Sequence, residues 1–319
     1  MSRPGSRERR ALQPTRDHLD LGLVVRGHGR HYLVETSEGA RVLCHPRGKK
    51  SDAVVGDRVR WQPTGSDEGV IEALEPRRNL LYRQDEWRSK SFAANVDQLL
   101  VLVAVEPVFS ESLLTRALVA AAAAGIEARI GLNKTDLPGV AQARARLAPY
   151  VAMGVPMFEW SLSADPQAAL ALLQPWLAGK TTLVLGPSGT GKSTLTNLLI
   201  PDAQAQVGEI SVALNSGRHT TTHTQWYWLD AEKTAGWLDS PGFQTFGIQH
   251  VEPMQLATLL PDFVAAQQVH GGCRFANCTH RQEPGCAVQA ARAAGTIGES
   301  RYRVFLELFD ELSRPPHYG

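Results

Sequence analysis

The sequence predicts an α/β domain with a mainly parallel sheet, preceded by a small antiparallel barrel and followed by a largely helical segment. Three observations lead to this prediction. Short alternating apolar runs, broken by glycine and proline, fill about residues 19–80. Strand-like and helix-like runs then alternate as far as about residue 250, and a Cys/His cluster follows in the remainder. Strands that alternate with helices of about ten to fifteen residues are typical of a parallel sheet.

The N-terminal runs predict the barrel. GLVVRGHGRHYLVET, ARVLCHP, GDRVRWQP and GVIEALEPR show apolar residues at every second position, with turn residues between them. Short antiparallel strands of this kind close into small barrels. The segment 77–95 is rich in charge, and we expect a linker there. Six basic residues of the barrel suit contacts with phosphates, or equally an ordinary solvated face: Arg26, Arg30, Arg41, Arg47, Lys49 and Lys50.

Composition narrows the class of protein. A chain of 319 residues suits about two or three domains, and a net charge of +1 favours no particular partner. The first sixteen residues carry five Arg against one Glu, so we expect a disordered basic tail at 1–18, with or without a polyanion contact. No run is long enough to span a membrane, and the start lacks an apolar signal region. We therefore expect a cytoplasmic protein without membrane contact.

The α/β segment contains the expected elements in order. Strands are predicted at 96–107, 127–132, 155–160 and 181–186, with helices at 110–125, 140–151 and 166–177 between them. The first strand is apolar almost throughout, as in a sheet that is covered on both faces. The carboxyl ends of such strands form the crevice where ligands bind.

The stretch GPSGTGKS matches the phosphate-loop pattern G-x-x-x-x-G-K-S, and it lies between a strand-like and a helix-like run. Its glycines allow backbone N–H groups to surround phosphate oxygens at a helix start. Lys192 is expected to reach the β- and γ-phosphates, and the Ser193 hydroxyl to bind Mg²⁺. A chance glycine-rich turn would have to coincide with both flanks. The expected phosphate contacts are Gly186, Pro187, Ser188, Gly189, Thr190, Gly191, Lys192, Ser193 and Thr194.

The motif NKTD, which contains Asn133, Lys134 and Asp136, follows an apolar strand upstream of the phosphate loop. A carboxylate only accepts hydrogen bonds, so Asp136 can bind the N1–H and the exocyclic amine of guanine. Adenine has an acceptor at N1 and no amine at C2, so the same carboxylate rejects it. If the four-residue match is accidental, the phosphate loop belongs to an ATPase or a kinase instead.

Two further motifs follow the phosphate loop. SGRHTTTHT contains Thr220, Thr221 and Thr222, one of which would close on Mg²⁺ when a γ-phosphate is present; a polar surface loop is the alternative. DSPG begins with Asp239, which would hold Mg²⁺ through water, and ends with Gly242, whose N–H would meet the γ-phosphate. These are the positions of switch I and switch II in a GTPase.

The motifs therefore run in a rotated order: base reader, phosphate loop, switch I and switch II. Joining the end of the set to its beginning restores the usual GTPase order. Circular permutation is permissible because strands need to be adjacent only in space, and domain termini are often close together. The stretch EWSLSAD lies between the base reader and the phosphate loop, and it would contact the guanine carbonyl through 161–164, with Ser161 and Ser163 as candidates.

Small GTPases commonly place a Gln after the switch II glycine to orient the attacking water. Phe243 occupies that position here, so we expect slow intrinsic hydrolysis and a catalytic group from another loop or from a partner. His219 is the best internal candidate and His223 a weaker one, although His219 could equally serve structure or RNA contact. Lys192 and Thr221 complete the expected catalytic set.

The stretch CRFANCTHRQEPGC contains Cys273, Cys278, His280 and Cys286. Three thiolates and one imidazole suit a tetrahedral structural Zn²⁺ site with no open position. The alternative is a set of reduced cysteines packed in a core. His270 is close to the cluster but redundant. Cys44, far from the others, is expected to be a buried small side chain.

The barrel, NKTD ahead of GPSGTGKS, GRHTTT, DSPG and the Cys/His spacing together resemble the RsgA (YjeQ) family of circularly permuted, ribosome-dependent GTPases. The resemblance covers about residues 19–319. It implies a circularly permuted α/β P-loop GTPase domain with a mainly parallel sheet, an N-terminal OB-fold β-barrel and a C-terminal zinc-binding, largely helical domain. We expect these domains at 91–250, at 19–90 with the linker included, and at 251–319.

The resemblance also implies a function. It indicates GTP hydrolysis that is stimulated by the small (30S) ribosomal subunit, late in its maturation, by a protein that binds 16S rRNA. The implied cofactors are one structural Zn²⁺ per chain and Mg²⁺ with GTP, and a monomer is expected. Two alternatives stay open at this point: a P-loop ATPase or kinase with an accidental NKTD, and an RNA-binding module with a weak nucleotide site.

Overall fold

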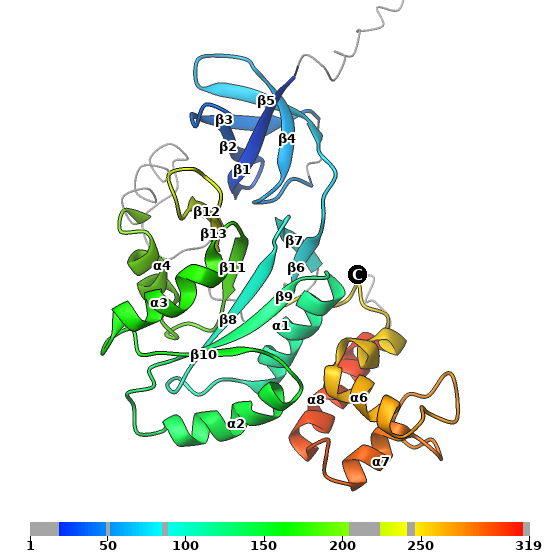
Figure 1. Cartoon of the computed structure of the whole chain (residues 1–319). Coiled ribbons are helices and arrows are strands. Elements are labelled where there is room, and N and C mark those ends of the chain that lie inside the picture. Colours follow the sequence, from blue (N-terminus) through cyan, green and yellow to red (C-terminus); the bar gives the residue numbers. More distant parts are fainter. Residues whose placement is uncertain (1–18, 49–51, 85–88, 204–223, 241–245, 315–319) are drawn as a thin grey trace, which may run out of the picture.

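A computed structural model describes residues 19–48, 52–84, 89–203, 224–240 and 246–314. Figure 1 shows the barrel at one end of the molecule, the α/β domain in the middle and the C-terminal helices beside α1. None of the helices in these described ranges combines the length and the apolar character that crossing a membrane requires.

Five strands form the predicted barrel: β1 (Asp20–His28), β2 (His31–Thr36), β3 (Arg41–Pro46), β4 (Arg58–Pro63) and β5 (Glu68–Leu74). They follow the order β1-β2-β3-β5-β4, and pairing of β1 with β4 closes the barrel. Trp61 and the fully buried Cys44 lie in its core, as expected for Cys44. Gly69 is required beside them, because a Cβ there would lie 2.6 Å from the Trp61 ring. The five-stranded OB-fold barrel is thus confirmed, but it is not wholly antiparallel as predicted, because β3 and β5 pair parallel.

The segment that we expected to be a linker contains a two-stranded ribbon instead. β6 (Leu80–Gln84) and β7 (Ser89–Ala94) pair antiparallel, and β7 crosses the expected domain boundary between residues 90 and 91. Leu81 and Phe92 are buried in the same core as the central sheet. The ribbon was missed because its apolar positions are too few, among many charges, to show a period.

The central sheet has the predicted parallel character. It contains β8 (Gln98–Ala104), β9 (Glu127–Asn133), β10 (Met157–Glu159), β11 (Thr181–Leu185), β12 (Gln225–Trp228) and β13 (Gly236–Asp239), in the order β10-β9-β8-β11-β13-β12. Only β12 runs antiparallel to its neighbour β13; the other pairs are parallel. Every residue of β8 is buried, because helices cover both faces of the sheet.

Four helices provide this cover: α1 (Glu111–Ala123), α2 (Val140–Ala152), α3 (Pro166–Leu177) and α4 (Lys192–Leu199). Leu114 of α1 and Leu147 of α2 share one core with the odd-numbered residues of β8. Leu173 of α3 and Leu195 of α4 share another core with Leu100 and Leu102. This places α1 and α2 on one face of the sheet and α3 and α4 on the other.

The sheet continues into the barrel, because β12 also pairs with β1, where Gln225 lies opposite Arg26. Arg26 is only 8% exposed at this junction, so neither role considered for it, a phosphate contact or a place on a solvated face, fits its burial. Neither β12 nor the junction was predicted, since their pairing depends on residues far apart in the sequence.

The C-terminal segment is largely helical, as predicted. A 3₁₀ helix, η2 (Pro253–Leu259), precedes α6 (Pro261–Val269), α7 (Ala287–Ala293) and α8 (Glu299–Leu312). The amphipathic α8 buries Phe305 and Leu308 against the rest of this segment. Arg301 of α8 donates to Thr115 Oγ1 of α1 at 2.8 Å, so the C-terminal helices are attached to the α/β domain.

Candidate nucleotide site and metal centre

The predicted phosphate loop joins β11 to α4 at the carboxyl edge of the sheet. Gly191 has a φ of 103°, and a Cβ there would lie 2.4 Å from Asn133 Nδ2, so only glycine fits. The Lys192 ammonium donates to the carbonyls of Gly186 at 2.7 Å and Pro187 at 2.8 Å. Burial lowers the pKa of Lys192, and nearby Asp239 acts in the opposite direction. The cation is therefore held inside the loop.

Asn133 of the NKTD motif connects three segments. Its Nδ2 donates to the Thr190 carbonyl of the phosphate loop at 2.9 Å. Its Oδ1 accepts from the backbone N–H of Lys134 at 2.8 Å and of Leu162 at 3.1 Å. With 2% exposure, Asn133 joins the NKTD strand, the phosphate loop and the 161–164 loop. The sequence signal for this role is an asparagine directly after an apolar run, which also fits the base-reader function predicted for the motif.

Asp136 is exposed, with its carboxylate oriented by Ser161. The Ser161 hydroxyl donates to Asp136 Oδ1 at 2.5 Å and accepts from the Ala164 N–H at 3.1 Å. Ser163 Oγ lies 3.1 Å from Ser161 Oγ. The 161–164 loop thus lies directly beside the carboxylate of the expected base reader, as the rotated order predicts.

Asp239 ends β13 next to the phosphate loop and is 6% exposed. Burial raises the pKa of Asp239 to about 6, although Lys192 and hydrogen bonds with Thr196 and the Ser240 backbone act to lower it. Ser193 and Thr194 are exposed in the first turn of α4. A buried carboxylate, a lysine and a free hydroxyl group therefore gather where Mg²⁺ and phosphates are expected.

Several expected residues lie outside the described ranges. They are the candidates of switch I and the end of switch II: His219, Thr220, Thr221, Thr222, His223, Gly242 and Phe243. Their roles stay predictions. The basic tail at 1–18 and the barrel residues Lys49 and Lys50 also lie outside these ranges.

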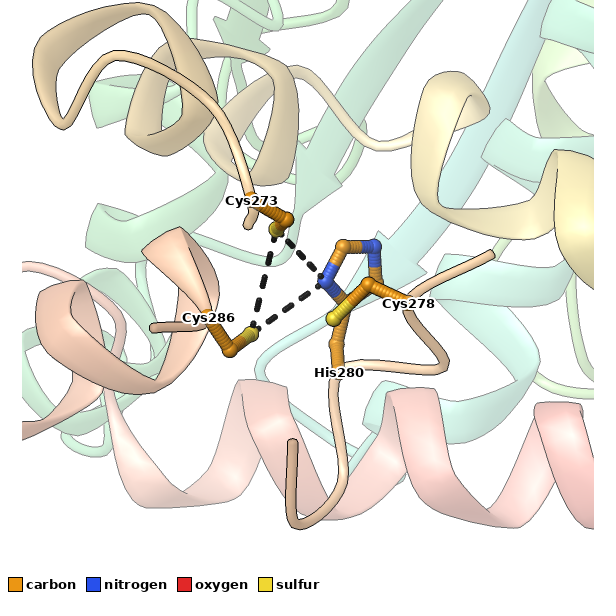
Figure 2. A group of neighbouring side chains, drawn as sticks. All are labelled: Cys273, Cys278, His280 and Cys286. Atoms are coloured by element: carbon orange, nitrogen blue, oxygen red, sulfur yellow. Dashed lines mark hydrogen bonds between the residues drawn. The ribbon is translucent and has the colours of Figure 1, made fainter. Parts of the chain in front are cut away.

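The structure brings all four predicted metal ligands together (Figure 2). Their donor atoms lie within 4.8 Å of one another. His280 Nδ1 is 3.5 Å from Cys273 Sγ and 3.4 Å from Cys286 Sγ, and these two sulfurs are 4.0 Å apart. Tetrahedral Zn²⁺, with bonds of about 2.3 Å to sulfur and about 2.0 Å to nitrogen, requires separations of about 3.5–3.8 Å. The donor set fits zinc, and the separations among Cys273, His280 and Cys286 are close to the required values.

The surrounding backbone positions these ligands. The Ala287 N–H donates to Cys273 Sγ and the Gln289 N–H to Cys286 Sγ, each at 3.4 Å, at the start of α7. The His280 carbonyl accepts from Gln289 Nε2 and from the Tyr302 hydroxyl, each at 2.8 Å. Burial raises the pKa of Cys278 to about 12, so a bound cation would stabilise its thiolate.

The turn between Cys278 and Cys286 closes on the Glu283 carboxylate. Glu283 Oε1 accepts from the N–H and the hydroxyl of Thr279, at 2.7 and 2.5 Å. Glu283 Oε2 accepts from the backbone N–H of Arg281 at 2.9 Å. Burial acts to raise the pKa of Glu283, but these hydrogen bonds outweigh it and lower the pKa to about 2. The carboxylate is therefore ionised and fixes the ligand loop.

Known proteins are similar to this chain in both sequence and fold. A family model described as RsgA GTPase matches residues 74–249. A protein of Variovorax paradoxus (strain S110) named small ribosomal subunit biogenesis GTPase RsgA is 54% identical over 319 residues, 98% of this chain and 99% of its own. A Bordetella pertussis protein of the same name is 54% identical over 292 residues, 91% of this chain and 95% of its own.

Two solved structures resemble the whole chain. The crystal structure of YjeQ from Thermotoga maritima is 31% identical with a TM-score of 0.69, and the match covers 93% of this chain and 99% of that one. The crystal structure of YloQ, described as a circularly permuted GTPase, is 25% identical with a TM-score of 0.66, covering 96% of this chain and 99% of that one. The rotated motif order is thus shared with a permuted GTPase of known structure.

Proposed function

The chain belongs to the RsgA GTPase family, and on that basis we propose that it hydrolyses GTP as a late maturation factor of the small ribosomal subunit, stimulated by that subunit. The names of its relatives support the biogenesis role. One observation supports the nucleotide chemistry above all: Asn133 bonds both the phosphate loop and the 161–164 loop. The end of the NKTD strand, the phosphate loop and the 161–164 loop are therefore held together by one side chain, which supports this proposal.

In the proposed site, the phosphates lie in the 186–194 loop, where Lys192 leaves its two loop carbonyls to reach the β- and γ-phosphates. Asp136 reads the guanine edge, with its carboxylate oriented by Ser161, and Ser163 lies beside the base. Ser193 and Asp239 would hold Mg²⁺, directly and through water. When bound, that ion neutralises charge on the β- and γ-phosphate oxygens.

Hydrolysis then requires one water in line with the bond between the γ-phosphorus and its bridging oxygen. Thr221 and its neighbours would close on the ion, Gly242 would meet the γ-phosphate, and His219 would orient the water. The alternative, an ATPase or kinase with an accidental NKTD, is less well supported: the carboxylate of Asp136, oriented by Ser161, suits the two neighbouring donors of guanine, N1–H and the C2 amine, and adenine lacks this pair.

The four-ligand centre is proposed to hold one structural Zn²⁺. Three of the four ligands are buried, and the set leaves no open coordination position for a substrate. The ion would hold the start of α7 against the loop from Cys273 to Cys286, and so stabilise the C-terminal helices rather than take part in hydrolysis.

The proposed macromolecular partner is the small (30S) subunit with its 16S rRNA, bound by a monomer in the cytoplasm. Of the six basic barrel residues considered for phosphate contacts, Arg30 and Arg47 are exposed and are compatible with RNA phosphates. Arg47 also pairs with Glu72, so only part of its charge is available for such a contact.

GTP turnover with and without purified small subunits tests the function. We expect slow turnover by the chain alone and a rise of about tenfold or more with small subunits. Large subunits and the Lys192→Ala variant serve as controls, and neither should show the rise. Equal turnover in all of these conditions would support the remaining alternative, an RNA-binding module with a weak nucleotide site.

A further inference from the structure

Arg116 lies in α1, away from the nucleotide site, with a side chain that is 7% exposed. Its Nη1 donates to the Phe246 carbonyl at 3.3 Å and to Glu311 Oε1 at 2.8 Å, and its Nη2 donates to Glu311 Oε2. Glu311 belongs to α8. One buried cation therefore joins a helix of the α/β domain, the chain that leaves the switch II position and the last helix of the C-terminal segment.

Phe246 is the first described residue after that switch II position. Its ring packs edge-on against Phe92, with centroids 5.8 Å apart. It also lines an apolar cavity beneath the phosphate loop, together with Gly186 and Pro187. These are the two residues whose carbonyls accept from Lys192. Phe246 therefore lies beside the phosphate loop and is also hydrogen-bonded to Arg116 through its carbonyl.

We infer that Arg116 is a positioning residue for GTP hydrolysis: it fixes the Phe246 carbonyl, and with it the residue that lines the cavity beside Gly186 and Pro187, from an anchor on α8. This inference rests on the proposed function. A planar guanidinium can bond a carboxylate with both terminal nitrogens and still reach a carbonyl, whereas the ammonium of lysine lacks this fork. The attachment of α8 thereby affects the geometry of the reaction, although α8 supplies none of the residues expected to bind the nucleotide.

The same interface supplies a matched control. Arg301 of α8 is also buried and donates to Thr115 Oγ1, the neighbour of Arg116, and to Asp262 at 3.1 and 3.2 Å. It holds α8 on α1 through these contacts, whereas the Phe246 carbonyl accepts from Arg116. A change at Arg301 loosens the interface alone, while a change at Arg116 loosens the interface and also releases the carbonyl.

The test measures kcat and KM for GTP, zinc content and thermal stability of the full chain for wild type, Arg116→Met, Arg116→Lys, Glu311→Gln and Arg301→Met. For Arg116→Met we expect kcat to fall about tenfold, with KM within about twofold of wild type and zinc retained. Arg116→Lys should be more stable than Arg116→Met but should have an equally low kcat, because lysine keeps the positive charge but lacks the paired N–H groups of the guanidinium. Arg301→Met should lose stability and keep kcat.

Equal kcat values for Arg116→Met and Arg301→Met would overturn the inference, as would full recovery of kcat in Arg116→Lys. If Arg116→Met does not fold, Glu311→Gln decides, since Glu311 is 31% exposed and the change keeps its shape. A lowered kcat at unchanged KM then supports the inference, and an unchanged kcat refutes it. Absence of GTP hydrolysis by wild type would instead refute the proposed function, so the two failures are distinguishable.

Discussion

Asn133 shows how one side chain assembles a site from segments far apart in the sequence. Its amide bonds the Thr190 carbonyl and its amide oxygen accepts from the Leu162 N–H, both in a buried setting. A buried group that loses its partner has a free-energy penalty of about 1–3 kcal/mol. The residue therefore contributes to nucleotide binding by holding two loops in place, whatever contact it makes with the base.

For Asn133→Ala we expect GTP affinity to fall about thirtyfold, equivalent to about 2 kcal/mol, because the Thr190 carbonyl and the Leu162 N–H lose their partner. Titration with a fluorescent GTP analogue measures this loss. The control is Asn197→Ala, a partly exposed position of α4. An affinity within about twofold of wild type for Asn133→Ala would show that the loops do not depend on this amide.

Glu283 is a second residue whose charge matters, because its carboxylate closes the turn between two zinc ligands. Its pKa is about 2 in the folded chain against an ordinary 4.5. A lowered folded pKa means that the stabilisation is fully present above about pH 4.5 and is lost as the pH falls toward 2. The group is thus ionised and stabilising at neutral pH.

Glu283→Gln should lower the thermal denaturation temperature at pH 7 and speed zinc loss to a chelator severalfold, since the glutamine cannot accept all of these hydrogen bonds as a carboxylate does. The gap in denaturation temperature between variant and wild type should narrow as the pH is lowered below about 4.5. The exposed Glu252→Gln is the control. A gap that stays constant over this pH range would contradict the assigned role.

At the scale of elements, the junction of barrel and sheet depends on β2 and the β12–β13 hairpin as well as on the β1–β12 pairing. Glu35 of β2 is 5% exposed and accepts from Trp228 Nε1 at 2.8 Å and from Lys233 Nζ at 2.6 Å. Arg41 Nε lies 3.5 Å from its other oxygen. These contacts therefore hold the barrel against the β12–β13 hairpin.

Glu35→Gln keeps an acceptor for Trp228 but removes the charge that pairs with two cations. Removing one partner of a buried ion pair costs about 3–5 kcal/mol, whereas exposed pairs contribute about 0–1 kcal/mol. Since Lys233 is 41% exposed, we expect the free energy of unfolding to fall by an amount between these limits, about 1–2 kcal/mol. Urea denaturation measures it, with exposed Glu38→Gln as the control. A Glu35→Gln variant as stable as this control would refute the stabilising role of Glu35 at the junction.

At the scale of the whole molecule, local patterns predicted most of the fold. The period-two runs of the barrel, the apolar β8 and the helices between strands are encoded locally, and all of them form. The β6–β7 ribbon and β12 were missed, because two short strands and a four-residue strand carry too few positions to show a period. The burial of Arg26 depends on its pairing opposite Gln225, which no local pattern reveals.

The candidate site, like the fold, has features that local patterns predict and features that depend on contacts between distant residues. Spacing within one motif predicted the phosphate loop and the four metal ligands, which the structure brings together. Contacts between motifs, such as Asn133 with Thr190 or Arg116 with Glu311, depend on how distant segments pack. The rotated order could be predicted because each motif is a short local pattern. The contacts that this order produces between motifs could not be predicted from such patterns.

The central claim is that the rotated motifs form one guanine-specific site, and nucleotide affinity tests it most directly. Calorimetry with GTP, ATP and xanthosine triphosphate should show that wild type binds GTP about a hundredfold more tightly than ATP. Asp136→Asn should prefer the xanthine nucleotide, because an amide can donate to its C2 carbonyl and accept from its N1–H. The exposed Asp202→Asn should bind as wild type does. Equal affinity for GTP and ATP, unchanged by Asp136→Asn, would contradict the claim.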